Sequence, residues 1–213
     1  MQNIICALRT MCEPETGFVD LFDKNKSLAK LMTLTDDQND IILFAKLFYG
    51  KARANLIALI KDAYQYKKYA EMILCDLISD GLSYADARAA LDIFFITFGF
   101  PGYRGVTFNP ILEFVSYDSG DFKTVYEGET KDGKEYGVGK RQNYYEGESC
   151  GFDECVWVAG RMIGYCYALE IEMGEYETKK YGFIVNDNFV GKYMTVYEDG
   201  DEGYMNGKPF DVE

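Results

Sequence analysis

An abrupt change of composition near Arg104 constrains this chain more than any other feature. Residues 1–104 contain 13 leucines, 12 alanines and 5 glycines, whereas residues 105–213 contain 2, 2 and 16. Tyrosine rises from 6 to 12 across the same point. Leucine and alanine favour helices, whereas tyrosine favours strands and glycine favours turns. We therefore predict an α+β protein, with a small helical bundle in residues 1–104 and an antiparallel β module in residues 105–213.

Capping signals divide the first half into helices. Ser27 is expected to begin a helix through Leu34, and the run Thr35-Asp36-Asp37-Gln38 is a capping-box pattern that opens the next one. Gly50 suits the end of that second helix. Helical spacing then predicts segments over Ala52–Ala63, Tyr66–Ser79 and from Ser83 to Gly99. We expect four or five helices, with the boundary to the second half around Pro101 and Gly102, because proline cannot continue a helix.

The second half combines recurrent polar turns with short runs of alternating aromatic residues. Alternation of this kind between tight turns is typical of antiparallel hairpins. We predict eight or nine strands in a meander. The turn signals are Asp118-Ser119-Gly120, Lys131-Asp132-Gly133, Asn186-Asp187-Asn188, Glu198-Asp199-Gly200 and Asn206-Gly207.

A short repeat occurs within the strand half. Tyr126-Glu127-Gly128-Glu129 returns as Tyr145-Glu146-Gly147-Glu148, and Gly137-Val138-Gly139 lies between the two copies. The stretch YEGETKDGKEYGVGK resembles a MORN repeat (membrane occupation and recognition nexus). The resemblance implies stacked β-hairpins in an elongated single-layer sheet. The Gly-x-Gly return is missing at Ala159-Gly160-Arg161, and an ordinary meander rich in glycine and tyrosine is the alternative.

The helical half contains a fainter similarity. Three of its segments resemble a helical module found in many bacterial multidomain proteins, where it is attached to sensing, signalling or repeat domains. This resemblance implies a bacterial cytoplasmic protein and a module that makes contacts rather than performing chemistry. The segments are Val19-Asp20-Leu21-Phe22-Asp23, Gly81-Leu82-Ser83-Tyr84-Ala85-Asp86-Ala87 and Phe98-Gly99-Phe100.

Composition disfavours several classes of function. The chain has no histidine, which removes the usual general base and the commonest zinc ligand. Its net charge is −13, and residues 105–213 alone have 22 acidic and 10 basic residues. Binding to nucleic acid or anionic lipid is therefore disfavoured. No apolar run approaches the roughly 20 residues of a membrane span, and the first residues do not form a signal peptide, so we expect no membrane insertion and a cytoplasmic location.

Six cysteines raise the question of a metal site or a disulfide. None forms a Cys-x-x-Cys pair. A zinc site could draw on Cys150, Cys155 and Cys166 with Asp153 as a fourth ligand, and a bridge between Cys150 and Cys155 is a further alternative. In a reducing compartment these residues are expected to be free, partly buried thiols, and we expect no cofactor.

The leading functional hypothesis is a non-enzymatic interaction protein or scaffold. The strand half would present an acidic, aromatic face to a protein partner or to a second copy of the chain. The candidate binding residues are Tyr126, Tyr145, Trp157, Tyr167 and Tyr193, with a core position favoured for Trp157. The alternatives are a hydrolase of glycans or peptides that uses carboxylates or a cysteine, and a sensor of a small ligand or metal.

Overall fold

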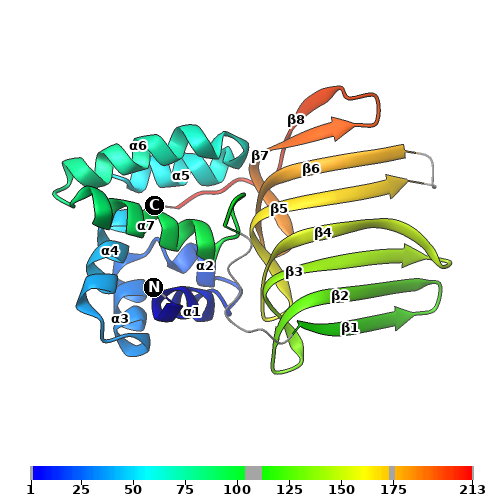
Figure 1. Cartoon of the computed structure of the whole chain (residues 1–213), viewed down its shortest axis with the longest axis horizontal. Coiled ribbons are helices and arrows are strands. Elements are labelled where there is room, and N and C mark those ends of the chain that lie inside the picture. Colours follow the sequence, from blue (N-terminus) through cyan, green and yellow to red (C-terminus); the bar gives the residue numbers. More distant parts are fainter. Residues whose placement is uncertain (1, 104–111, 173–175, 213) are drawn as a thin grey trace.

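A computed structural model describes residues 2–103, 112–172 and 176–212 (Figure 1). Within these residues, helices occupy the first half and an eight-stranded antiparallel sheet occupies the second, so the α+β prediction is confirmed. The helices are α1 (Gln2–Met11), α2 (Gly17–Asp20), α3 (Lys24–Leu34), α4 (Gln38–Tyr49), α5 (Arg53–Lys61), the 3-10 helix η1 (Ala63–Gln65), α6 (Tyr66–Ser79) and α7 (Tyr84–Thr97). The strands are β1 (Leu112–Ser119), β2 (Phe122–Lys131), β3 (Lys134–Tyr145), β4 (Glu148–Val158), β5 (Arg161–Glu172), β6 (Tyr176–Val185), β7 (Asn188–Tyr197) and β8 (Glu202–Asn206).

Side-chain caps explain where several helices begin. The Asp37 carboxylate accepts hydrogen bonds from two backbone N–H groups at the start of α4, and the Ser83 hydroxyl accepts one from Asp86 at the start of α7. The prediction that Ser27 begins a helix was wrong, because the N-cap of α3 is Asp23, four residues before Ser27. The expected number of helices was also too low, since α1 and α2 were not predicted.

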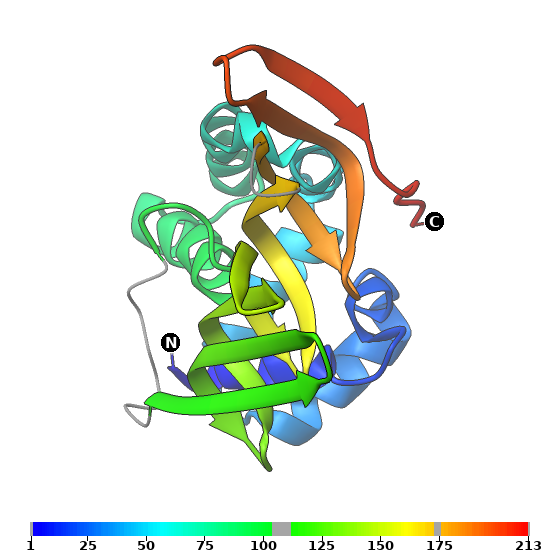
Figure 2. The ribbon, with the colours of Figure 1, turned by 90° about the vertical axis from the view of Figure 1, so that its right-hand side faces the viewer.

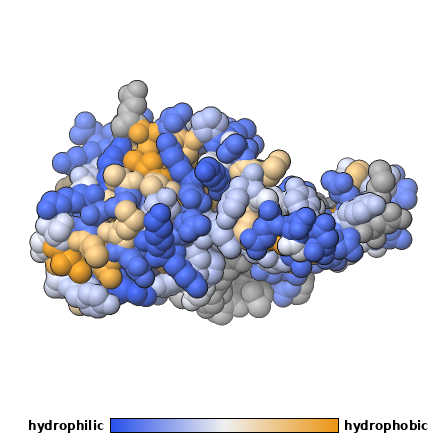
Figure 3. Space-filling view, turned by 90° about the horizontal axis from the view of Figure 1, so that it is seen from above, coloured by the Kyte–Doolittle hydropathy of each residue, from blue (hydrophilic) through white to orange (hydrophobic). Residues whose placement is uncertain are grey.

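The eight strands form one open sheet in which each strand pairs with its neighbours in sequence, as the meander prediction requires. All helices lie at one end of the strands, here called the proximal end (Figure 1). The distal end projects as a thin arm from the thicker helical body (Figure 3), and seen from that end the sheet is curved with the helices behind it (Figure 2). The predicted junction at Arg104 lies outside the described residues.

The two faces of the sheet have different surroundings. The helix-side face contributes residues such as Val156, Ile163 and Phe183 to the main hydrophobic core. The opposite face, here called the open face, carries a second cluster that includes Trp157 and Cys166. Successive side chains of a strand point to opposite faces of a sheet. The strand register therefore shows on which of the two faces each strand residue lies.

One hydrophobic core joins the helices to the sheet. The Phe18 ring lies 5.2 Å from Phe98 on the helical side and 5.2 Å from Phe183 of β6. Phe210, from the segment after β8, returns to the helices and packs against Phe18 and Phe22. The main core therefore contains residues from both halves of the chain, including its last described segment.

The backbones of the two halves also touch directly. The Tyr165 N–H of β5 donates a hydrogen bond to the Phe98 carbonyl at 2.7 Å. The neighbouring Gly164 has a φ of +99°, and a Cβ atom there would lie 2.3 Å from the Phe98 oxygen. Gly191 of β7 approaches the Lys61 carbonyl of α5 in the same way. These two glycines allow the helices to dock at backbone contact distance.

Candidate functional site

Tyr126 shows why the repeat needs its glycines. Its ring lies over Gly128 and Gly139, which face each other across β2 and β3. A Cβ atom on either glycine would come within 2.4 Å of the Tyr126 hydroxyl oxygen. The same ring contacts the edge of Trp157 at 5.6 Å, and both side chains are fully buried. The Tyr-x-Gly and Gly-x-Gly elements thus build a packed cluster on the open face rather than a surface for a partner.

The second copy of the repeat has a different structure. Tyr126-Glu127-Gly128 lies inside β2, whereas Glu146 and Gly147 form the turn between β3 and β4 with φ values of +50° and +86°. A Cβ atom on Gly147 would meet nothing within 4 Å. The expectation that Tyr145 opens a second equivalent unit was therefore wrong.

The remaining predicted binding residues lie apart from one another. Tyr167 is half-buried on the helix-side face, where its ring stacks on Tyr181 at 4.9 Å. Tyr193 is half-buried on the open face and stacks on Phe189 at 4.5 Å. Of the five predicted residues, Tyr145 is the one with a largely exposed side chain.

The open face carries most of the exposed aromatic side chains of the sheet, and they gather at its distal end. Phe122 and Tyr145 are cross-strand partners with ring centroids 4.8 Å apart. Tyr176 and Tyr197 lie on the far side of the sheet, on β6 and β7. Tyr117 of β1 is exposed on the same face, but it lines a cavity with Thr124, Glu135 and Arg141, away from the distal end. The register places all of these side chains on the same face as Tyr126 and Ile184. We call Phe122, Tyr145, Tyr176 and Tyr197 the distal rim; their exposed fractions lie between 43% and 63%.

Sequence reasoning missed three of the four rim residues. A signal was present, because Phe122 follows the predicted turn Asp118-Ser119-Gly120 and Tyr197 directly precedes Glu198-Asp199-Gly200. The repeat instead pointed to tyrosines in the middle of strands, which are buried in a packed sheet. Residues next to the distal turns stay exposed because none of the described helices covers that end (Figure 1).

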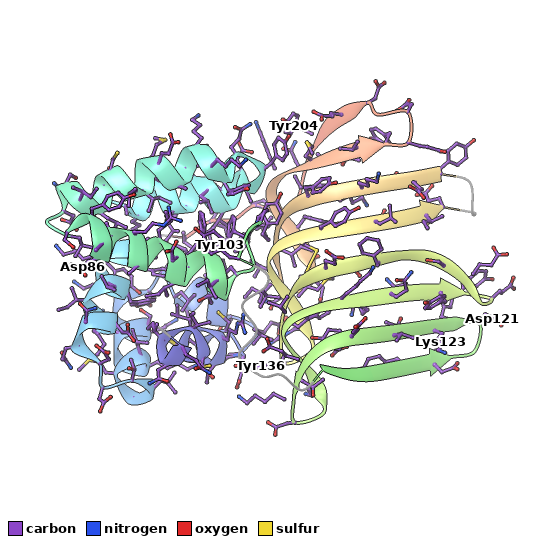
Figure 4. The ribbon with its side chains drawn as sticks, in the orientation of Figure 1. Asp86, Tyr103, Asp121, Lys123, Tyr136 and Tyr204 are labelled. Carbon is purple, nitrogen blue, oxygen red and sulfur yellow. A yellow bond between two sulfur atoms is a disulfide. The ribbon has the colours of Figure 1, made fainter. Side chains whose placement is uncertain are left out.

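Carboxylates surround the distal rim. A cavity of about 470 Å³ is lined by Tyr176, Tyr197 and the acidic residues Glu177, Glu198 and Asp199. A second cavity of about 520 Å³, at the opposite corner of the distal end, is lined by Asp118, Asp121 and Glu146 together with Lys123. Lys123 alternates with Phe122, so this cavity lies on the helix-side face and not on the open face. Figure 4 shows Asp121 and Lys123 at the distal end of β1 and β2. Among the described residues, no ion pair joins these rim carboxylates to a lysine or arginine.

The centre of the open face is instead neutralised by its own ion pairs. The Arg141 guanidinium lies 4.3 Å above the Trp157 ring and 3.6 Å from the Asp153 carboxylate. Lys180 pairs with Glu170 on the neighbouring strands. Burial raises the pKa of the Asp153 carboxyl above its ordinary value, although Arg141 and Asn143 oppose this. The distal rim is therefore where the acidic character of the sheet meets exposed aromatic rings.

The raised pKa of Asp153 predicts a pH effect. A carboxyl group whose pKa is higher in the folded than in the unfolded state lowers the stability of the protein as the pH rises. The loss begins near the pKa of the unfolded state and is complete above the pKa of the folded state. We expect Asp153→Asn to be no less stable than the wild type at neutral pH, and the difference between the two to vanish under acidic conditions. Urea unfolding at several pH values measures this. If the variant is less stable than the wild type at neutral pH, the attraction between Asp153 and Arg141 outweighs the cost of burying the Asp153 carboxylate.

Cysteine chemistry differs from expectation. Cys155 and Cys166 are joined in a disulfide between β4 and β5, whereas Cys150 keeps a free thiol. The predicted alternatives of a Cys150–Cys155 bridge and of free thiols at these positions were therefore wrong. Two of the three thiolates of the suggested zinc site are consumed, and the described residues contain no group suited to a metal ion. A disulfide is typical of an oxidising compartment. The expectation that a reducing compartment keeps these cysteines as free thiols is therefore not supported.

The Cys155–Cys166 disulfide is expected to stabilise the sheet. It closes a loop with a sequence separation of 11, for which loop-closure entropy gives about 2–3 kcal/mol. We expect a reductant to lower the free energy of unfolding by this amount in urea titrations. The Cys155→Ala/Cys166→Ala variant is the control, because its stability should not respond to reductant. An equal response of both proteins would contradict the assignment.

The hydrolase alternative requires two carboxyl groups with raised pKa values that converge. Burial raises the pKa of Asp40 on α4 and of Asp153 on β4. These residues lie on different halves of the molecule and cannot act as an acid–base pair. The expectation of a non-enzymatic protein remains a prediction.

Comparison with protein-family models and with curated proteins finds no match for this chain. Among the helices of the described residues, none combines the length and the apolar character needed to cross a bilayer.

Proposed function

We propose that this protein is a non-enzymatic interaction module whose distal rim binds a basic segment of another protein. The observation that carries the proposal is the presence of four exposed aromatic side chains on one face, at the end of the sheet that none of the described helices covers. The MORN-like character of the strand half, which we retain as part of this proposal, implies hairpins stacked into a contact surface.

Charge defines the kind of partner. The strand half has a strong excess of acidic residues, and Glu177, Glu198 and Asp199 line the cavity that Tyr176 and Tyr197 form at the rim. A lysine or arginine side chain gains from the carboxylates and from the face of a tyrosine ring, whereas nucleic acid and anionic lipid are repelled. Apolar residues in the same segment would cover the Phe122–Tyr145 pair.

A pair of synthetic peptides tests the proposal. One alternates lysine with phenylalanine, and the other replaces each lysine by glutamate. We expect fluorescence anisotropy to detect binding of the lysine peptide to the wild type, weakening with added salt, and no binding of the glutamate peptide. The Phe122→Ser/Tyr145→Ser variant should bind the lysine peptide at least about tenfold more weakly, because exposed aromatic anchors carry much of the energy of such interfaces.

Tyr84→Ser provides the matched control. Tyr84 is 64% exposed at the start of α7, at the end of the molecule far from the rim. Thermal unfolding should show that all variants remain folded, since each replaced side chain lies on the surface. Equal binding of the two peptides, or an equal loss in the Tyr84→Ser control, would contradict the proposal.

A further inference from the structure

Strand β8 forms a free edge of the sheet. Figure 1 shows it as the upper border of the sheet, above the helices, and Figure 4 places Tyr204 there. Tyr204 and Met205 are both about half exposed, on opposite faces. Natural edge strands are usually protected from pairing by lysine, proline or a bulge, and the segment Glu202–Asn206 contains neither lysine nor proline.

Hydrogen bonds to β7 show which backbone groups of β8 remain available. The Tyr197 N–H donates to the Asp201 carbonyl at 3.0 Å, and the Gly207 N–H donates to the Gly191 carbonyl at 2.7 Å. Hydrogen-bonded positions recur every second residue in an antiparallel pair. The odd-numbered residues of β8 therefore face β7. The even-numbered residues Glu202, Tyr204 and Asn206 direct their N–H and C=O groups away from the sheet.

We propose that two copies of this chain pair through β8 in antiparallel orientation, about a two-fold axis at Tyr204. In this register Tyr204 faces Tyr204 of the second copy, and Glu202 faces Asn206. All three outward-facing residues of each strand then form hydrogen-bonded pairs. A shift by two residues in either direction loses one of these pairs, and a shift by four in one direction brings Glu202 opposite Glu202, which is unfavourable.

The side chains are self-complementary in this register, as a two-fold interface requires. Met205 faces Gly203 of the second copy, whose missing side chain leaves room beside the Tyr197 ring; a Cβ atom on Gly203 would lie 3.6 Å from that ring. Sulfur–aromatic contact is favourable. The same contact occurs twice. The pairing ends at Asn206, because the Lys208 backbone turns back to bond with Phe189 and Gly191 of β7.

The resulting assembly is a continuous sheet of sixteen strands, twice the eight in one chain. The two-fold axis reverses the strand direction, so the helical parts of the two copies lie at opposite ends of the joined sheet. The dimer uses the sheet edge, whereas the proposed function uses the rim. The peptide-binding test at Phe122 and Tyr145 can therefore refute the proposed function without affecting the dimer. The test at the sheet edge described below can refute the dimer without affecting the proposed function.

Cysteine cross-linking tests the register. The test uses a background in which three of the four free cysteines, Cys6, Cys75 and Cys150, are replaced by serine, whereas the buried Cys12 is kept. With oxidised glutathione as the oxidant, Tyr204→Cys is expected to form a covalent dimer, because residue 204 faces itself in the second copy. Asn206→Cys is the matched control, since it faces residue 202 and should stay monomeric on a denaturing gel. Equal cross-linking of the two variants would overturn the register.

Sedimentation velocity tests the association itself. The wild type is expected to show a dimer whose fraction rises with concentration. Met205→Glu should weaken that dimer at least about tenfold, because it places a carboxylate against Gly203 beside the acidic turn. Met32→Glu is the control, as Met32 is 62% exposed on α3, away from the sheet. A wild type that stays monomeric at every concentration, or an equal effect of both variants, would overturn the proposal.

Discussion

Gly164→Ala is expected to lower the free energy of unfolding by about 4 kcal/mol, from the combined cost of a positive φ and of a rigid clash. Gly164 has a φ of +99°, and the new Cβ atom would lie 2.3 Å from the Phe98 carbonyl oxygen. That oxygen cannot move away freely, because it accepts the hydrogen bond from the Tyr165 N–H at 2.7 Å. The substitution therefore separates α7 from β5 at the centre of the shared core.

Urea unfolding followed by circular dichroism measures this effect. Gly133→Ala is the matched control, because Gly133 also has a positive φ of +73° but a Cβ atom there would meet nothing within 4 Å. It should cost only the conformational penalty of about 1–2 kcal/mol. If Gly164→Ala and Gly133→Ala have the same stability, the backbone contact between the two halves does not constrain the protein.

Arg9→Met is the second substitution with a large expected effect. Arg9 of α1 and Glu129 of β2 are both almost fully buried, with the guanidinium nitrogen 3.7 Å from the carboxylate oxygen. Burial lowers the pKa of Arg9, and Glu129 opposes that shift. Removing the arginine takes a positive charge away from the buried Glu129 carboxylate. We expect a loss of about 3–5 kcal/mol in the free energy of unfolding, the usual result of breaking a buried ion pair.

A double-mutant cycle separates the ion pair from simple packing. Arg9→Met/Glu129→Gln removes both charges, and we expect it to recover more than half of the stability lost in Arg9→Met. Chemical denaturation of the four proteins gives the interaction energy. Additive losses would mean that Arg9 and Glu129 do not stabilise each other.

Local signals predicted those parts of the fold that depend on neighbouring residues. The limits of α6 and the cap of α7 at Ser83 agree with the structure, because helical spacing and capping hydrogen bonds involve residues close in sequence. Helix α1 was missed although Ile4 and Leu8 lie on one face of it. Its position depends on Arg9 reaching a strand more than a hundred residues away.

The candidate site was predicted less well than the fold. The sequence identified tyrosine and glycine as the important residue types, but it could not separate buried tyrosines from exposed ones. Tyr126 is buried because Gly128 and Gly139 meet beneath its ring, and that meeting depends on the register between two strands. The same tetrapeptide runs into a turn after Tyr145, where a Cβ atom on Gly147 would meet nothing within 4 Å.

The sequence by itself determined the division into helices and hairpins, the order of the strands and the acidic character of the sheet. Each of these follows from local propensity, turn chemistry or summed charge. Only the tertiary structure decided which end of the sheet the helices cover, and hence which aromatic residues remain exposed. That choice depends on contacts between distant segments, such as Phe98 with Gly164 and Arg9 with Glu129, for which no local pattern exists.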